Sequence, residues 1–177
     1  NAMIGSGGLV VMDENTCMVE VARFFMNFTQ NESCGKCVPC REGTKQMLDI
    51  LEDIVAGKGT EESLIMLEEL GEAITNTALC GLGKSAALPV LSTLRNFRKE
   101  YLEHVVEKRC ATGTCQALLN YKILPDVCKG CSKCARNCPV DAISGKVKEP
   151  FTIDQSVCIK CGTCLDNCPF GAIVKES

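Results

Sequence analysis

Three cysteines, Cys34, Cys37 and Cys40, recur at every third position in the segment NESCGKCVPCREG, residues 31–43. Thiols this close cannot all find disulfide partners at the required geometry within one short loop. The 177-residue chain holds 15 cysteines, an odd number, and one histidine. Disulfides in a secreted protein are therefore the weaker interpretation, and metal or iron–sulfur ligation in a reducing cytoplasm is the favoured one.

Composition excludes two classes of partner. The formal net charge is −3 when cysteine is counted as neutral. Thiolates that hold iron would make the net charge of the chain more negative, which argues against nucleic-acid binding. No apolar run approaches the ~20 residues of a transmembrane helix, so we expect no membrane span and a cytoplasmic location.

Two segments near the C-terminus repeat one cysteine pattern at an offset of 30 residues. They read VCKGCSKCARNCPVDAIS from Val127 and VCIKCGTCLDNCPFGAIV from Val157. Each follows Cys-x2-Cys-x2-Cys-x3-Cys-Pro, the run of bacterial two-cluster ferredoxins, in which the fourth cysteine binds the other cluster. The pattern predicts two [4Fe–4S] clusters with crossed ligand sets: Cys128, Cys131, Cys134 and Cys168 for one, and Cys158, Cys161, Cys164 and Cys138 for the other.

A pair of structural zinc sites is the alternative for this repeat. Zinc modules usually bring two Cys-x2-Cys pairs from separate loops rather than a triplet followed by Cys-Pro. The resemblance to two-[4Fe–4S] ferredoxins covers residues 121–177 and implies a small ferredoxin-like α+β domain there.

The opening triplet lacks a Cys-Pro ending, so its fourth ligand must come from elsewhere. Apolar residues at helical spacing predict four helices in residues 14–109: one over 14–30, one from Glu42 to Gly57, one after the N-cap Thr60, and one from Ser85 past Tyr101. Four helices joined by short loops predict a four-helix bundle, and with the ferredoxin-like domain the fold class is α+β.

In that bundle the loop LCGLGKS returns to the end of the first helix, which makes Cys80 the expected fourth ligand. The alternative is that Cys80 is a small buried core residue. The Met and Phe residues of the helices, among them Phe24, Phe25 and Phe28, are expected to be core.

The segments GSGGLVVMDENTCM, ESCGKCVPCREGT and CGLG resemble the flavoprotein subunit of NADH dehydrogenases over residues 3–107. The resemblance implies that the triplet and a distant cysteine hold a [4Fe–4S] cluster, which takes electrons from the FMN of a preceding domain. Asn1-Ala2 before Met3 is expected to be a tag scar. The resemblance implies that the rest of residues 1–13 is the end of the preceding domain, so that FMN and NAD(P) bind only in the missing part.

With the appended ferredoxin module, the layout is similar to the flavin-bearing beta subunit of multimeric NAD(P)-linked hydrogenases, including electron-bifurcating ones. The resemblance implies an oxidoreductase complex whose other members are a thioredoxin-like [2Fe–2S] subunit and a hydrogenase-type catalytic subunit, or an external ferredoxin as acceptor. We find no nucleophile–base or acid–base constellation, and therefore expect an electron relay without catalytic residues of its own. The alternatives are a subunit of NADH-quinone or NAD-dependent formate dehydrogenase, and a metal-stapled interaction module without a redox role.

The twelve expected cluster ligands leave Cys17, Cys110 and Cys115 unassigned, and His104 is the only histidine. Three thiolates and one imidazole match a closed, tetrahedral, structural zinc site. The alternative is that Cys17 packs in the core and His104 is an exposed helix residue. We therefore predict three [4Fe–4S] clusters and a Zn²⁺ ion that ties the linker, residues 110–120, to the first helix.

Overall fold

The structure is a computed structural model and describes residues 10–176. The expected tag scar, and most of the segment taken as the end of a preceding domain, lie outside the described residues. Apolar side chains form two separate cores, one between Cys17 and Leu118 and one between Tyr121 and Ile173. Within the described part, no helix is long and apolar enough to cross a bilayer.

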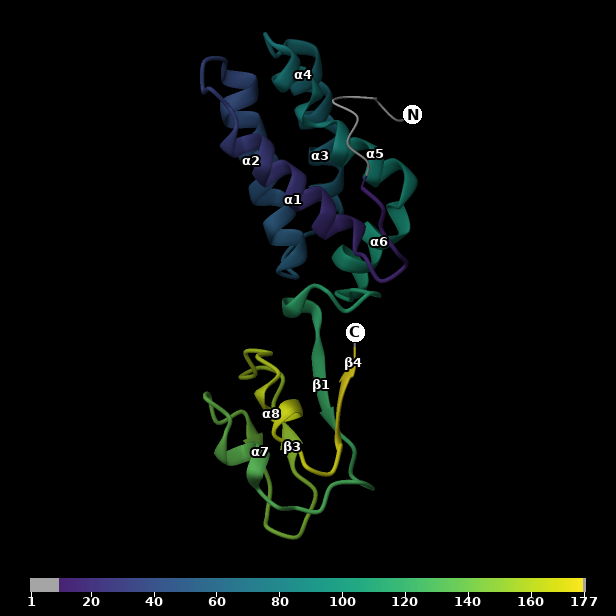
Figure 1. The fold of residues 1–177 in the computed structure, drawn as a ribbon, viewed down its shortest axis with the longest axis vertical. Coiled ribbons are helices and arrows are strands. Elements are labelled where there is room, and N and C mark those ends of the chain that lie inside the picture. The colour runs from purple at the N-terminus through teal and green to yellow at the C-terminus, as the bar shows by residue number, and fades with distance from the viewer. Residues whose placement is uncertain (1–9, 177) are drawn as a thin grey trace.

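The first core lies inside a helical domain (Figure 1). Its long helices are α1 (Met18–Asn31), α2 (Val38–Val55) and α3 (Glu61–Thr77), followed by the shorter α4 (Gly81–Ala86), α5 (Leu88–Asn96) and α6 (Arg98–Leu102). A single-turn π-helix, η1 (Glu103–Glu107), and a 3-10 turn, η2 (Gln116–Leu118), complete the segment. Helix α1 packs against both α2 and α5, and α3 packs against α2, α4 and α5.

Several helix ends follow the expected local chemistry. Thr60 is the N-cap of α3, and its backbone N–H donates to the Ser63 hydroxyl at 3.1 Å. Helix α2 ends at Val55, and Gly57 takes a positive φ of 78°, which glycine adopts without steric cost. Pro89 lies in the first turn of α5, where its missing N–H leaves no helical bond unmade.

The expectation of one long helix from Ser85 past Tyr101 is wrong. The segment forms α4, α5 and α6, and the backbone leaves the helical region at Phe97 with φ −125° and ψ 33°. Pro89 cannot donate a hydrogen bond to the carbonyl four residues earlier, so the helix restarts there instead of continuing. Helix α2 also begins at Val38, earlier than the expected Glu42, because Pro39 is tolerated in its first turn.

The expectation that Phe24 and Phe28 are core residues is also wrong. They are 62% and 56% exposed, whereas Val19, Ala22 and Met26 form the buried face of α1. Apolar residues cover more than half of the circumference of this helix, so helical spacing alone did not indicate which part of that wide face packs against α2 and α5.

The second core lies inside a small domain of two antiparallel strand pairs. Strand β1 (Asn120–Ile123) pairs with β4 (Ile173–Glu176), and β2 (Ile143–Ser144) pairs with β3 (Thr152–Ile153). The short helices α7 (Lys133–Arg136) and α8 (Thr163–Asp166) each follow the loop of one repeat. Helices in the first domain and strands with short helices in the second confirm the α+β class.

The two ends of α1 face different parts of the molecule (Figure 1). The α1–α2 loop and α4 lie at the end remote from the second domain, whereas α6 and the start of α1 lie beside the linker. Helix α1 has 14 residues. At 1.5 Å per residue, it separates these two ends of the helical domain by roughly 20 Å.

Candidate metal centres

Each repeat of the C-terminal domain contributes cysteines to two cavities. About 330 and 310 Å³ of space not filled by protein atoms lies in and in front of the two cavities, open solvent included. Cys128, Cys131, Cys134 and Cys168 line the first cavity, and Cys138, Cys158, Cys161 and Cys164 line the second. Each fourth cysteine thus lies in the cavity formed by the triplet of the other repeat, as the crossed ligand sets require.

The backbone repeats as closely as the cysteines do. The first repeat has positive φ at Gly130, Ser132 and Asp141, and the second has it at Lys160, Gly162 and Gly171, each 30 residues later. Three of these six positions are not glycine, although side chains disfavour this region. Both loops therefore fold around the same geometric requirement, which is to direct three thiols into one cavity.

Backbone N–H groups are directed at the sulfurs in both repeats. The N–H of Ala142 donates to Cys138 Sγ at 3.3 Å, and the N–H of Ala172 donates to Cys168 Sγ at 3.4 Å. Hydrogen bonds of this kind stabilise a thiolate and set the potential of a cluster that it ligates. Four sulfurs around one recess, with N–H groups directed at them, are a donor set that fits a [4Fe–4S] cluster.

The opening triplet lies beside the segment that carries Cys80. A Cβ atom added to Gly83 of α4 would lie 3.4 Å from Cys40 Cβ and 3.7 Å from Cys40 Sγ, so α4 touches the triplet directly. The backbone amide of Leu79 also lowers the pKa of Cys37 below its usual value. Cys80 follows that amide and is exposed, which removes support for its being a core residue.

Helix ends add a favourable field at the triplet. Cys37 is the N-cap of α2, Cys40 lies in the first turn of the same helix, and Cys80 is the N-cap of α4. The N-terminus of a helix carries partial positive charge from its unpaired N–H groups, which favours thiolate over thiol. The Ser33 hydroxyl lies 3.3 Å from Cys40 Sγ and offers a further polar contact. The two helix ends therefore direct partial positive charge toward the sulfurs that would hold a cluster here.

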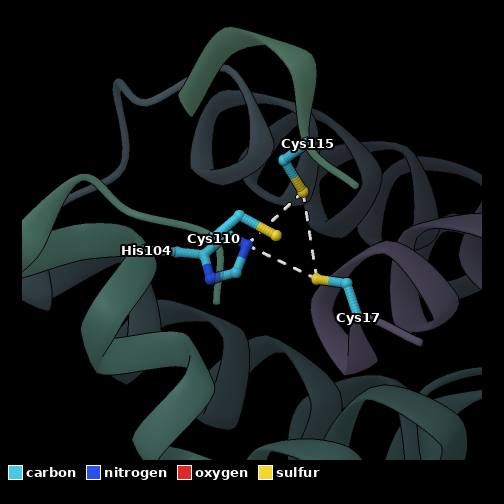
Figure 2. A group of neighbouring side chains, drawn as sticks. All are labelled: Cys17, His104, Cys110 and Cys115. Atoms are coloured by element: carbon cyan, nitrogen blue, oxygen red, sulfur yellow. Dashed lines mark hydrogen bonds between the residues drawn. The ribbon is translucent and has the colours of Figure 1, made fainter. Parts of the chain in front are cut away.

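The four leftover residues come together at the other end of the helical domain. Figure 2 shows Cys17, His104, Cys110 and Cys115 directing their side chains toward one point. Their ligand atoms all lie within 4.8 Å of one another, and all four residues are buried. Cys17 is the N-cap of α1, and His104 belongs to η1. His104 is only 2% exposed, so the alternative of an exposed helix residue is wrong.

The distances within this cluster fit one tetrahedral ion. Bonds of ~2.3 Å to sulfur and ~2.0 Å to nitrogen at tetrahedral angles place two sulfurs roughly 3.8 Å apart, and a sulfur and a nitrogen roughly 3.5 Å apart. The Sγ atoms of Cys17 and Cys115 are 3.9 Å apart. His104 Nε2 lies 3.4 Å from each of these sulfurs.

His104 is held in the orientation that a metal ligand needs. Its Nδ1 lies 2.7 Å from the Glu100 carbonyl oxygen and donates to it, which leaves Nε2 to face the sulfurs. The Glu100 carboxylate accepts from the N–H of Met18 at 2.9 Å, so one residue positions both His104 and the start of α1. Sequence reasoning missed Glu100, and its place four residues before His104 was the only available indication.

The protonation of the cluster also favours a cation. Burial lowers the pKa of His104, but the thiols of Cys110 and Cys17 outweigh it and raise the pKa to about 10. Hydrogen bonds from Cys115 and Cys17 lower the pKa of Cys110, whereas the same contacts raise the pKa of Cys115. The pKa values of His104, Cys110 and Cys115 thus depend on their close contacts within the cluster, and a metal ion would replace the protons of its ligands.

The end of the helical domain is fixed to the rest of that domain, and the linker that follows is fixed to the ferredoxin-like domain. The Lys108 ammonium donates to the Gly59 carbonyl, and the carboxylate of the buried Glu103 lies 3.6 Å from the Arg109 guanidinium. On the other side, the Lys175 ammonium donates to the Gly113 carbonyl at 2.8 Å, and Lys160 donates to the Ala117 carbonyl.

The π-helix that presents His104 has no recognisable sequence signature, although such turns are frequent at functional sites.

Comparison with known proteins gives matches to both halves. Residues 20–104 match the NADH-ubiquinone oxidoreductase-F iron-sulfur binding region, and residues 127–172 match the 4Fe-4S dicluster domain. The chain is similar to the NADP-reducing hydrogenase subunit HndC of Solidesulfovibrio fructosivorans, with 53% identity over 149 residues that cover 84% of this chain and 30% of that protein.

Two further relatives match mainly one part of the chain. The mitochondrial NADH-ubiquinone oxidoreductase 51 kDa subunit of Neurospora crassa is 37% identical over 97 residues, which cover 55% of this chain and 20% of that protein. A crystal structure of NAD+-reducing [NiFe]-hydrogenase in the H2-reduced state aligns with a TM-score of 0.52 and 35% identity, covering 54% of this chain and 17% of that chain.

The chain spans less than a third of the length of these curated relatives. The matches confirm the resemblances that the sequence motifs indicated. Residues 20–104 are similar to the NADH-ubiquinone oxidoreductase-F iron-sulfur binding region, and residues 127–172 are similar to the 4Fe-4S dicluster domain.

Proposed function

We propose that this chain is the electron-relay part of a subunit in an NAD(P)H-linked oxidoreductase complex that contains a hydrogenase. The observation that carries the proposal is the pair of cavities in which each cysteine triplet is completed by a cysteine of the other repeat. Iron–sulfur clusters bound there would supply one-electron transfer. The protein contributes thiolate ligands, N–H groups directed at sulfur, and an apolar core that keeps water away.

The relay has two separate parts. The helical domain, residues 14–109, would bind one [4Fe–4S] cluster through Cys34, Cys37, Cys40 and Cys80. The ferredoxin-like domain, residues 121–177, would bind two, with the crossed ligand sets given above. Because the triplet and the linker lie at opposite ends of α1, roughly 20 Å apart, we propose that a partner's cofactor connects the two parts.

The helical domain and the linker together would hold Zn²⁺ through Cys17, His104, Cys110 and Cys115. Its role is structural because all four positions are filled by protein ligands and the site is buried. A filled site would bind η1 and the Cys110–Cys115 turn to the start of α1. The linker would then hold the ferredoxin-like domain at a defined position on the helical domain.

A hydrogenase-type complex is favoured over an NADH-quinone or formate dehydrogenase complex. The match to HndC extends over 84% of the chain and so reaches into the ferredoxin-like domain, whereas the match to the ubiquinone-linked relative covers 55%. FMN and NAD(P) would bind in a preceding part of the subunit. A thioredoxin-like [2Fe–2S] subunit, a catalytic subunit or a ferredoxin would exchange electrons with this chain. Its free thiols suit a reducing cytoplasm.

An electron titration separates this proposal from a metal-stapled interaction module without redox function. Anaerobically purified protein should be brown, and its visible absorbance should bleach with dithionite as about three electrons per chain are taken up, one per cluster. Redox-silent zinc gives no visible absorbance. A colourless protein that takes up no electrons would establish the interaction module and refute the relay.

A further inference from the structure

The two cavities of the ferredoxin-like domain differ in charge although their cysteines are equivalent. Residues 127–146 contain four basic side chains and one acidic one, whereas the corresponding residues 157–176 contain two of each. Lys129 and Lys133 line the first cavity, and their counterparts at the second cavity are Ile159 and Thr163. Arg136 corresponds to Asp166. The two cavities therefore share the arrangement of their cysteines and differ in the charge of the side chains around them.

The five basic side chains of residues 127–148 are Lys129, Lys133, Arg136, Lys146 and Lys148, and we call them the basic lobe. All five are exposed. The turn with Lys146 and Lys148 lies against the first cysteine loop, because the N–H of Lys148 donates to the Gly130 carbonyl at 3.0 Å. Among the ion pairs of residues 10–176, none involves a member of the basic lobe.

An apolar centre accompanies these charges. Pro169 and Phe170 line the first cavity next to Lys129 and Lys133, and Phe170 is 45% exposed. An aromatic residue surrounded by charged side chains is the usual composition of a transient protein interface, in which the centre gives affinity and the rim gives steering. At the second cavity the counterpart of Phe170 is Val140, and the structure gives that cavity no charged lining residue.

The two cavities also differ in their neighbours within the chain. The loop of the second repeat contacts the linker through the bond from Lys160 to the Ala117 carbonyl, and Gly162 lies beside the Tyr121 hydroxyl. The loop of the first repeat contacts the Lys146–Glu149 turn of its own domain. The second cavity is thus the one joined to the linker, and the first is the one whose lining cations remain exposed.

We infer that the basic lobe is the docking surface for a small one-electron carrier protein with an acidic surface. The inference rests on the proposed relay function and assigns the cavity of Cys128, Cys131, Cys134 and Cys168 as the site where electrons are exchanged with that carrier. One electron passes between this site and the carrier, so that one partner is oxidised as the other is reduced, and no bond forms or breaks. The unpaired lysines steer the acidic carrier and place it over Phe170.

Binding of an acidic [2Fe–2S] plant-type ferredoxin to the cluster-loaded chain tests the inference. Both proteins are kept oxidised, and the dissociation constant is measured by anaerobic calorimetry at low and at physiological salt. The double variant Lys129→Glu/Lys133→Glu should bind at least about ten-fold more weakly at low salt, and the difference should shrink at physiological salt because salt screens exposed charges. Basic cytochrome c should bind the same variant more tightly than the wild type.

Ile159→Glu is the matched control, because it places a glutamate at the position of the second repeat that corresponds to Lys129. It should change ferredoxin binding by less than about two-fold. A second double variant, Lys146→Glu/Lys148→Glu, lies outside the cysteine loops, so it should weaken binding in the same way even if the first pair disturbs its cluster. Equal binding by wild type and both double variants, or an equal loss with Ile159→Glu, would overturn the docking surface.

Iron content and dithionite bleaching of the same samples separate this outcome from failure of the relay. Wild-type protein without iron refutes the proposed function. Intact, reducible clusters combined with lysine-independent binding refute only the docking surface. A chain that ignores ferredoxin but dimerises at low salt through the same lysines would make the lobe an interface between copies and would likewise contradict the inference.

Discussion

Replacement of Cys80 by alanine is expected to remove about four of twelve iron atoms per chain. The Cys34–Cys40 segment supplies three sulfurs, and the structure places α4 and the Leu79 amide against two of them. Three ligands leave one corner of a cuboidal cluster without a thiolate, and that corner faces solvent because Cys80 is exposed. Alanine is preferred to serine here because a serine oxygen could still bind iron.

Iron analysis and EPR spectroscopy of the reduced protein measure this effect. About eight irons should remain, and the EPR signals of the two ferredoxin-like clusters should be unchanged. Ser33→Ala is the control, since its hydroxyl lies 3.3 Å from Cys40 Sγ without belonging to the proposed ligand set. Retention of all iron by Cys80→Ala would show that another group completes the cluster.

Cys110→Ser is expected to remove zinc and to leave the iron content unchanged. The four ligand atoms lie within 4.8 Å of one another, so loss of one thiolate opens a site that is otherwise closed by protein. Without the ion, η1 and the Cys110–Cys115 turn would keep only the packing of side chains such as Val105 and exposed bonds such as Lys175 to the Gly113 carbonyl. We expect proteolysis in residues 104–119 to accelerate at least about ten-fold, which corresponds to ~1.4 kcal/mol of lost local stability.

Thr112→Ala is the matched control for this variant. Its hydroxyl lies 3.3 Å from Cys110 Sγ on the same turn, but it is not one of the four clustered ligands. Zinc content and the protease pattern of Thr112→Ala should therefore equal those of the wild type. A Cys110→Ser protein that keeps one zinc per chain and an intact linker would show that zinc does not bind at this cluster.

Spacing predicted the features that depend on covalent geometry. A Cys-x2-Cys-x2-Cys loop can point three thiols to one side only with a particular backbone, and the positive φ values of Gly130 and Lys160 are part of that backbone. The same holds for the end of α2 at Gly57 and the start of α3 at Thr60, where one residue decides the local structure.

Features that depend on tertiary packing were harder to predict from the sequence. Helix α1 is apolar on several sides, and only its contacts with α2 and α5 decide that Met26 is buried while Phe24 is exposed. The interruption at Phe97 and the π-turn at His104 likewise follow from packing around Tyr101, whose hydroxyl lies 2.9 Å from that of Thr93. The convergence of Cys17 with His104 joins positions 87 residues apart, and counting unassigned ligands was the only route to it.

Metal analysis of the anaerobically purified wild-type chain tests the central claim most directly. Iron, acid-labile sulfide and zinc should be measured on one sample whose protein concentration is set by amino-acid analysis. Three [4Fe–4S] clusters and one structural ion predict about twelve irons, twelve sulfides and one zinc per chain. A chain that contains zinc but neither iron nor sulfide would contradict the account, because its cysteines would then hold the fold together without carrying electrons.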